Sequence, residues 1–118
     1  MGFIYVPVSV KAVGGEDRYE TRFLLDTGAI DSMAPETALR KVGVEPVGTK
    51  TYELADGSQQ DFRYGLARIE FMGAITAGRI IFGPDDAEPF LGVTALAAAG
   101  VSIDPSTQTL RKLPAVRL

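Results

Sequence analysis

The chain has 118 residues, which fits one domain with a single modest core, so we expect one domain over residues 1–118. It contains no His and no Cys, which excludes Ser-His-Asp and Cys-His catalysis, imidazole or thiolate metal sites, and disulfides. The net charge is −3 and the basic residues are scattered, so we expect no nucleic-acid partner.

The first part of the chain predicts a β-hairpin. Apolar residues recur at every second position over residues 4–12, which is typical of a half-buried strand. A turn at Gly14-Gly15-Glu16-Asp17 precedes a second alternating segment, residues 19–25. The alternation ends at Leu24-Leu25, where two large apolar residues are adjacent. We therefore expect this strand to enter the core immediately before Asp26-Thr27-Gly28.

The rest of the chain predicts short strands and one or two short helices. Pro35 near the start and Gly43 after the end indicate a helix of about two turns, and Gly100 closes a second helical segment over residues 94–99. The expected strands and apolar runs are residues 51–54, 62–72, 80–82, 90–92, 101–103 and 109–113. The expected turns lie at Asp56-Gly57, Gly73, Gly83-Pro84 and Asp104-Pro105-Ser106. The predicted fold class is therefore mostly β.

No membrane association or secretion is expected. The longest purely apolar stretch is far shorter than a membrane-spanning helix requires. The first residues, Met1 to Tyr5, carry no basic residue ahead of their apolar part, and no long apolar region of a secretory signal follows. We therefore expect a cytoplasmic protein.

Asp26-Thr27-Gly28 is the candidate catalytic motif. Without His and Cys, acid–base chemistry near neutral or acidic pH depends on Asp and Glu. A carboxylate directly after a core strand can be held rigidly and partly desolvated, which suits an acid or a base. Gly28 allows a tight turn, and the Thr27 hydroxyl can fix the loop. The structural alternative is an ordinary turn, because Asp-x-Gly also closes turns without any catalytic role.

The motif and its surroundings resemble the retropepsin-like aspartic proteases, the single-domain branch that includes the retroviral enzymes. Phe23-Leu24-Leu25-Asp26-Thr27-Gly28-Ala29 is similar to the active-site signature of this family, and Phe90-Leu91-Gly92 to its second signature. Gly83-Pro84 matches a Gly-Pro shortly before that second signature. Ala55-Asp56-Gly57-Ser58 falls at the tip of the family's flap, the hairpin that covers the substrate. The motifs occur in the family's order from about Tyr5 to Leu113.

The resemblance implies a closed acid-protease-type β-barrel with a flap hairpin, assembled as a homodimer. Aspartic proteases use two facing carboxylates, one ionised as a base and one protonated to polarise the scissile carbonyl. This chain has one Asp-Thr-Gly and is too short for two lobes, so the second carboxylate is expected from Asp26 of the partner subunit. The resemblance also implies that Thr27 bonds across the two-fold axis, that Gly28 accepts the substrate backbone, and that residues 109–113 join a dimer sheet.

The expected reaction is hydrolysis of an extended peptide or protein, with no cofactor and no metal. The residues expected to bind the substrate follow the catalytic turn or form the flap tip: Ala29, Ile30, Asp31, Ala55, Asp56, Gly57 and Ser58. Three acidic residues, Asp85, Asp86 and Glu88, lack the ligand spacing of known calcium loops, and we interpret them as solvated.

The chain departs from the family at two positions and in the flap. Retroviral members usually have an acidic residue where this chain has Ile30, and often an Arg where it has Val93. In the family these two charges form an ion pair near the dimer contact, and an apolar contact can replace such a pair without loss of stability. In the family this acidic residue also contacts the substrate backbone, a contact that Ile30 cannot make through a carboxylate. Asp31 is the next residue along the chain. The predicted flap tip is also polar, with Gly57 its single glycine.

Two other functions stay open beside an aspartic endopeptidase. The first is a non-catalytic member of the same fold that binds extended peptides or only dimerises, which Ile30 and the polar flap favour. The second is a small β-barrel adaptor with a chance Asp-Thr-Gly, which would be a monomer and leaves the second signature unexplained. The intact Asp-Thr-Gly favours the peptidase, because a binding module has no need of a paired carboxylate.

Overall fold

The computed structural model describes residues 3–104 and 106–118. Met1 and Gly2 of the N-terminal segment, and Pro105 in the predicted turn Asp104-Pro105-Ser106, lie outside the described residues. Within the described ranges the protein is mostly β, with nine strands and two short helices, which confirms the predicted fold class.

The predicted N-terminal hairpin is confirmed. β1 (Tyr5–Ala12) and β2 (Tyr19–Leu25) pair antiparallel from Tyr5 opposite Leu24 to Val10 opposite Tyr19. The even residues of β1 from Val6 to Val10 are buried, as the alternation requires. On β2 the burial is concentrated near the end, where Phe23 is fully buried. The strand therefore enters the core just before the Asp26 turn.

A short strand that the sequence pattern does not predict follows that turn. β3 (Ser32–Pro35) pairs in parallel with β6 (Ala74–Gly83), and Met33 also pairs with Phe90 of β7 (Phe90–Leu91). Four residues that end in Pro carry no strand periodicity of their own. β3 forms because two distant strands supply its backbone partners, which only the tertiary fold provides.

Both predicted helices are present. α1 (Glu36–Lys41) follows Pro35, and α2 (Val93–Ala99) follows Gly92. Gly43 and Gly100 close them with positive φ angles of 90° and 67°, a conformation that glycine adopts at little cost.

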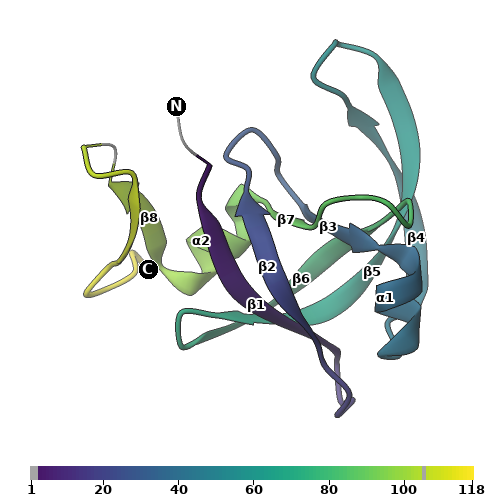
Figure 1. Cartoon of the computed structure of the whole chain (residues 1–118), viewed down its shortest axis with the longest axis horizontal. Coiled ribbons are helices and arrows are strands. Elements are labelled where there is room, and N and C mark those ends of the chain that lie inside the picture. Colours follow the sequence, from purple (N-terminus) through teal and green to yellow (C-terminus); the bar gives the residue numbers. More distant parts are fainter. Residues whose placement is uncertain (1–2, 105) are drawn as a thin grey trace.

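The middle strands are longer than predicted. β4 (Pro46–Glu53) and β5 (Gln59–Phe71) form a hairpin that rises from the body of the protein, and β5 then pairs with β6 (Figure 1). The first residues of β5 are polar and exposed, so backbone pairing with β4 rather than burial forms this part of the strand. The predicted strand at residues 80–82 is the buried end of β6.

The strands form a ring of pairings around the core. Their order is β1-β2-β7-β3-β6-β5-β4, and β1 also pairs with β5, so β4 is left as an edge strand. The largest fully buried apolar side chains come from β1, β2, β5, β6 and β7, from α1, and from the segment after α1: Val10, Phe23, Leu39, Val44, Ile69, Ile80 and Leu91.

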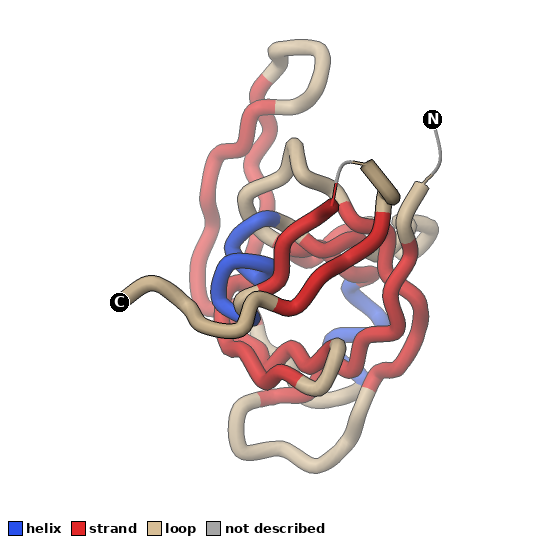
Figure 2. The backbone as a smooth tube through the Cα atoms, turned by 90° about the vertical axis from the view of Figure 1, so that its left-hand side faces the viewer, coloured by secondary structure: helices blue, strands red, loops and turns tan. Residues whose placement is uncertain are grey.

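The chain ends in a separate two-stranded sheet. β8 (Val101–Asp104) and β9 (Thr109–Lys112) pair antiparallel, and Leu113 donates its backbone N–H to the Gly100 carbonyl at 2.8 Å. In Figure 1 this hairpin lies on the side of the molecule away from α1, and in Figure 2 it faces the viewer in front of the larger sheet. In the described part of the chain, neither helix has the length and apolar character needed to cross a membrane.

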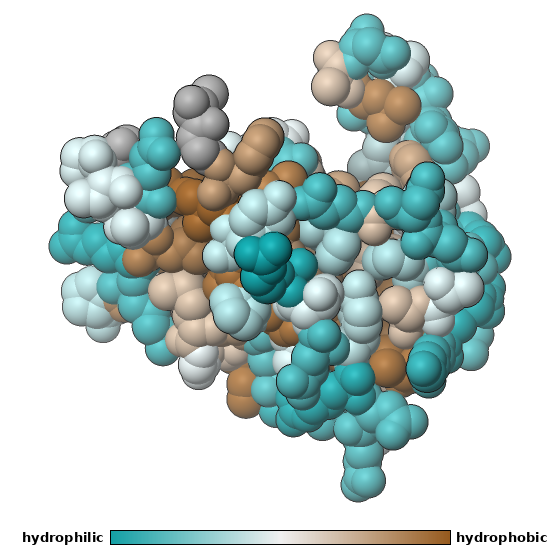
Figure 3. Space-filling view, in the orientation of Figure 1, coloured by the Kyte–Doolittle hydropathy of each residue, from teal (hydrophilic) through white to brown (hydrophobic). Residues whose placement is uncertain are grey.

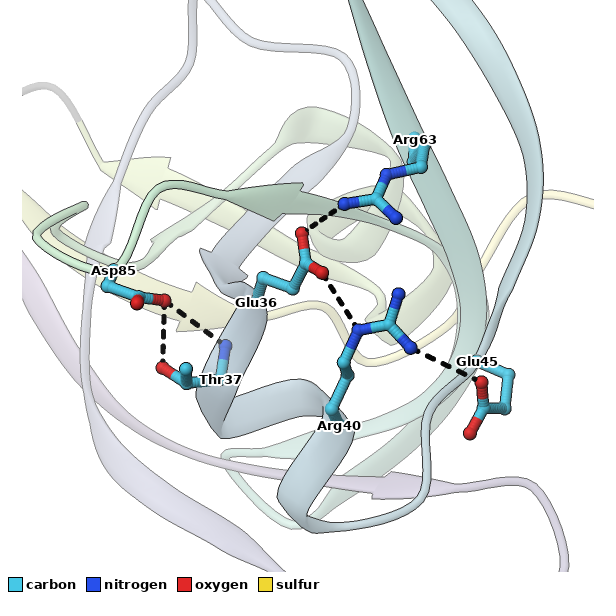
Figure 4. Close-up of polar contacts among 6 residues, drawn as sticks. All are labelled: Glu36, Thr37, Arg40, Glu45, Arg63 and Asp85. Atoms are coloured by element: carbon cyan, nitrogen blue, oxygen red, sulfur yellow. Dashed lines mark hydrogen bonds and ion pairs between the residues drawn. The ribbon is translucent and has the colours of Figure 1, made fainter.

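Ion pairs and hydrogen bonds hold α1 to its surroundings (Figure 4). Glu36 accepts a hydrogen bond from Arg40 Nε at 2.8 Å and pairs with Arg63 of β5. Thr37 donates its hydroxyl to Asp85 at 2.9 Å. The hydrogen bond from Arg40, together with the Arg63 charge, holds the pKa of Glu36 below its ordinary value.

Replacing Glu36 with Gln is expected to lower stability at neutral pH but not at acidic pH. Because the pKa of Glu36 is lowered in the folded state, its ionised carboxylate stabilises the fold when the pH is above the ordinary pKa of 4.5. This contribution disappears as the pH falls through the folded-state pKa. Urea midpoints of Glu36→Gln and wild type should therefore differ at about pH 7 and converge at about pH 3. The control is Glu16→Gln in the exposed β1–β2 turn. An equal difference at both pH values contradicts the prediction.

Candidate functional site

The Asp26-Thr27-Gly28 turn is anchored to the core at its first residue. Asp26 donates its backbone N–H to the Leu91 carbonyl of β7 at 3.0 Å, and its side chain is half-buried. The Asp26 Oδ1 atom accepts the Gly28 N–H at 3.0 Å, and the Asp26 carbonyl accepts the Ala29 N–H at 3.2 Å. The carboxylate thus closes its own turn and has a fixed place at the end of a core strand.

The second predicted signature lies directly beside this turn. Gly92 donates its N–H to the Ser32 hydroxyl at 3.0 Å, and Val93 donates its N–H to the Ala29 carbonyl at 2.8 Å. The Thr94 hydroxyl donates to the Ile30 carbonyl at 2.8 Å. The start of α2 therefore supports the segment that follows the Asp26 turn.

A cleft of about 760 Å³ opens between the Asp26 turn and the β4–β5 hairpin, which lie on the same side of the molecule (Figure 1). The space-filling view shows the molecule hollowed beside this hairpin (Figure 3). The predicted site residues on its wall are Asp26, Gly28, Ala29, Ile30, Asp31 and Ala55. The other lining residues are Met33, Lys50, Thr51, Tyr52, Glu53, Leu54, Phe62, Ile81 and Phe90. The cleft therefore combines carboxylates with a largely apolar wall.

Four predicted site residues lie outside this lining. Thr27 is exposed on the Asp26 turn, and Asp56, Gly57 and Ser58 form the tip of the hairpin. The tip is a closed turn, in which Asp56 Oδ1 accepts the Ser58 N–H at 2.9 Å and Gly57 has a φ of 85°. Hydrogen bonds from Ser58 lower the pKa of Asp56. The substrate-binding role of the tip stays a prediction.

Asp31 is a buried charge with partners from two strands. Only 3% of it is exposed, and its Oδ2 atom accepts hydrogen bonds from the Tyr52 hydroxyl at 2.7 Å and from Arg79 Nε at 3.1 Å. Burial, followed by the hydrogen bond to Asp31, raises the pKa of Tyr52. Sequence reasoning missed both partners. The sequence does hold a signal for Arg79, because it is a charged residue inside the largely apolar strand β6. A charged side chain needs a partner when it is partly buried.

Ile30 and Val93 are the two positions that depart from the retropepsin pattern. Backbone hydrogen bonds connect the segment that contains Ile30 with the segment that contains Val93. The Ile30 carbonyl accepts the Thr94 N–H at 3.1 Å, next to the Val93–Ala29 bond. Ile30 is 59% exposed and Val93 is half-buried. Within one chain the Ile30 side chain is therefore left open at the cleft.

The three acidic residues before β7, Asp85, Asp86 and Glu88, are all exposed, and Asp85 is bonded to α1. Asp85 accepts hydrogen bonds from the Thr37 hydroxyl and backbone N–H, at 2.9 and 3.4 Å. Among the described residues no group of three or more Asp, Glu, His or Cys side chains is arranged to hold a metal ion.

No family model matches this chain, and no curated protein matches it either.

Proposed function

We propose that this protein is an aspartic endopeptidase of the retropepsin-like type, in which Asp26 and Asp26 of the partner subunit form the catalytic dyad. The observation that supports this most is the position of Asp26. It is half-buried at the end of a core strand, it lines a cleft beneath an overhanging hairpin, and it is fixed to the Phe90-Leu91-Gly92 segment. This is the arrangement that both predicted signatures require.

The proposed mechanism needs only the two carboxylates and a water molecule. The ionised carboxylate takes a proton from water as the water oxygen attacks the scissile carbonyl carbon. The protonated carboxyl gives its proton to the carbonyl oxygen, which becomes a hydroxyl of the tetrahedral intermediate. As the intermediate collapses and the C–N bond breaks, the carboxyl that took a proton from water gives it to the nitrogen, and the other carboxylate takes back a hydroxyl proton. The products are a carboxylic acid and an amine.

A second copy completes the proposed site. Two carboxylates roughly 3 Å apart cannot both ionise, so a facing pair retains the single proton that the mechanism needs. Apolar side chains near the chain ends are open to solvent, with Phe3 77% and Val116 62% exposed, and apolar side chains gather beside the N-terminal segment and the C-terminal hairpin (Figure 3). β9 pairs only with β8 among the described residues, so its other edge can pair with another chain. These features fit dimerisation through the chain ends.

The β4–β5 hairpin is the proposed flap. Its stem contributes Tyr52, Leu54 and Phe62 to the cleft wall, and its polar tip lies beyond the wall. A hairpin in this position can cover an extended peptide and exclude water from the reacting atoms.

The alternative is a non-catalytic domain that binds extended peptides in the same cleft. The exposed Ile30 favours it, and so does the free edge of β4, because an edge strand beside a cleft can pair with the backbone of a peptide.

The test is cleavage of a degenerate peptide library across pH, with the oligomeric state measured by analytical ultracentrifugation at the assay concentration. The proposal expects a dimer that cleaves, with most activity below neutral pH. A dimer without activity at any pH supports the peptide-binding alternative. A monomer that cleaves contradicts the shared dyad, and an inactive monomer supports a small adaptor domain.

A further inference from the structure

Side chains on both strands hold the β4–β5 hairpin to the body of the protein. On β5, Arg63 pairs with Glu36 of α1. On β4, the Tyr52 hydroxyl donates to Asp31 at 2.7 Å. Among the side-chain hydrogen bonds of the described residues, this is the bond that joins β4 to the segment following the catalytic turn. β4 is an edge strand, so backbone pairing holds it on one side only, through β5. The bond to Asp31 attaches β4 at this point to the body of the protein.

Asp31 is suited to act as a fixed anchor. A carboxylate that is almost fully buried needs donors to offset the loss of hydration, and Asp31 receives two on one oxygen. One donor, Arg79, belongs to β6 in the body of the protein, and its guanidinium lies 5.8 Å from the centre of the Tyr64 ring. The other donor, Tyr52, belongs to the hairpin. Opening the hairpin at this point therefore leaves the buried charge with Arg79 alone.

The hydroxyl of Tyr52 and its ring have separate contacts. The ring packs edge-on against Phe62 with 6.1 Å between the centroids, and both residues line the cleft. The hydroxyl alone reaches Asp31. A change of Tyr52 to Phe therefore removes the anchor bond and keeps the packing of the hairpin stem.

We propose that Tyr52, Asp31 and Arg79 form a latch that sets the closed position of the β4–β5 hairpin over Asp26. Tyr52 and Asp31 are positioning residues in this role, because they act on the substrate through the hairpin. If the hairpin must be closed for the substrate to bind tightly, the apparent affinity for substrate is proportional to the fraction of molecules whose hairpin is closed. Breaking the latch lowers that fraction, so it raises KM more than it changes kcat. The catalytic consequence rests on the proposed peptidase function, whereas the attachment of the hairpin does not.

The test compares wild type, Tyr52→Phe and the control Tyr19→Phe by hydrogen exchange and by peptide cleavage. Tyr19 is a half-buried tyrosine of β2, and its hydroxyl makes no side-chain hydrogen bond among the described residues. In Tyr52→Phe we expect amides of residues 50–60 to exchange about fivefold faster or more, with β1 amides unchanged. We also expect KM to rise about fivefold, with kcat within about twofold of wild type. Tyr19→Phe should change neither quantity.

Two results would overturn the latch. One is unchanged exchange of the hairpin amides in Tyr52→Phe. The other is an equal acceleration in β1, because the change would then have weakened the whole fold. If wild type cleaves no peptide, the proposed function fails, but the exchange comparison still decides whether Tyr52 holds the hairpin closed. The two failures are therefore distinguishable.

Discussion

Replacing Asp26 with Asn is expected to reduce peptide cleavage about a thousandfold or more, because a carboxamide cannot take the proton from the attacking water. The fold should be unaffected. Asn keeps a side-chain oxygen in the place where Asp26 Oδ1 accepts the Gly28 N–H, so the turn can close as before. Peptide cleavage across pH gives the loss of activity, and urea unfolding with analytical ultracentrifugation shows whether the folded dimer is retained. Normal cleavage by Asp26→Asn excludes the dyad mechanism.

Mixed dimers test whether the two subunits share one site. When wild type and Asp26→Asn are allowed to exchange subunits, only dimers with two intact Asp26 residues should be active. Activity is then expected to fall with the square of the wild-type fraction. Mixing with Asp86→Asn is the matched control, because Asp86 is exposed on the loop before β7 and does not line the cleft. A linear fall with Asp26→Asn would mean that each chain acts alone.

The local elements could be predicted from the sequence because their signals are local. Alternation in β1 and β2 identified a hairpin, and the adjacent Leu24-Leu25 marked where the strand enters the core. Gly43 and Gly100 marked the ends of both helices because they adopt positive φ angles there. The position of the segment around Leu91 beside the Asp26 turn was implied only by the resemblance to the retropepsin-like family.

The remaining features depend on contacts between distant parts of the chain. β3 exists because β6 and β7 supply its backbone partners, and the early part of β5 exists because β4 lies beside it. The pairing of Asp31 with Tyr52 and Arg79 joins three separate segments. A single sequence gives no register between such segments, so Asp31 was predicted as a substrate-binding residue but its partners Tyr52 and Arg79 were not predicted.

Gly92, in the second predicted signature, lies very close to the segment that follows the Asp26 turn. A Cβ atom at this position would lie 2.5 Å from the Ile30 carbonyl oxygen and 2.7 Å from the carbonyl carbon and oxygen of Asp31. The backbone angles at Gly92, φ −91° and ψ 173°, are ones that alanine adopts easily. The obstacle to a side chain is therefore steric. It can be relieved only by moving backbone, because the atoms in the way belong to no flexible side chain.

Replacing Gly92 with Ala is expected to lower the free energy of unfolding by about 1–3 kcal/mol, the usual cost of forcing extra atoms into a packed site. The displaced segment carries Ile30 and Asp31 of the cleft wall, and a misplacement of about 1 Å can reduce kcat/KM about a hundredfold. Urea unfolding and peptide cleavage measure the two effects. The matched control is Gly78→Ala on β6, where a Cβ meets nothing within 4 Å and stability should stay within about 0.5 kcal/mol of wild type. If Gly92→Ala is as stable and active as Gly78→Ala, the close approach of Gly92 to the Asp26 segment is not a requirement of the site.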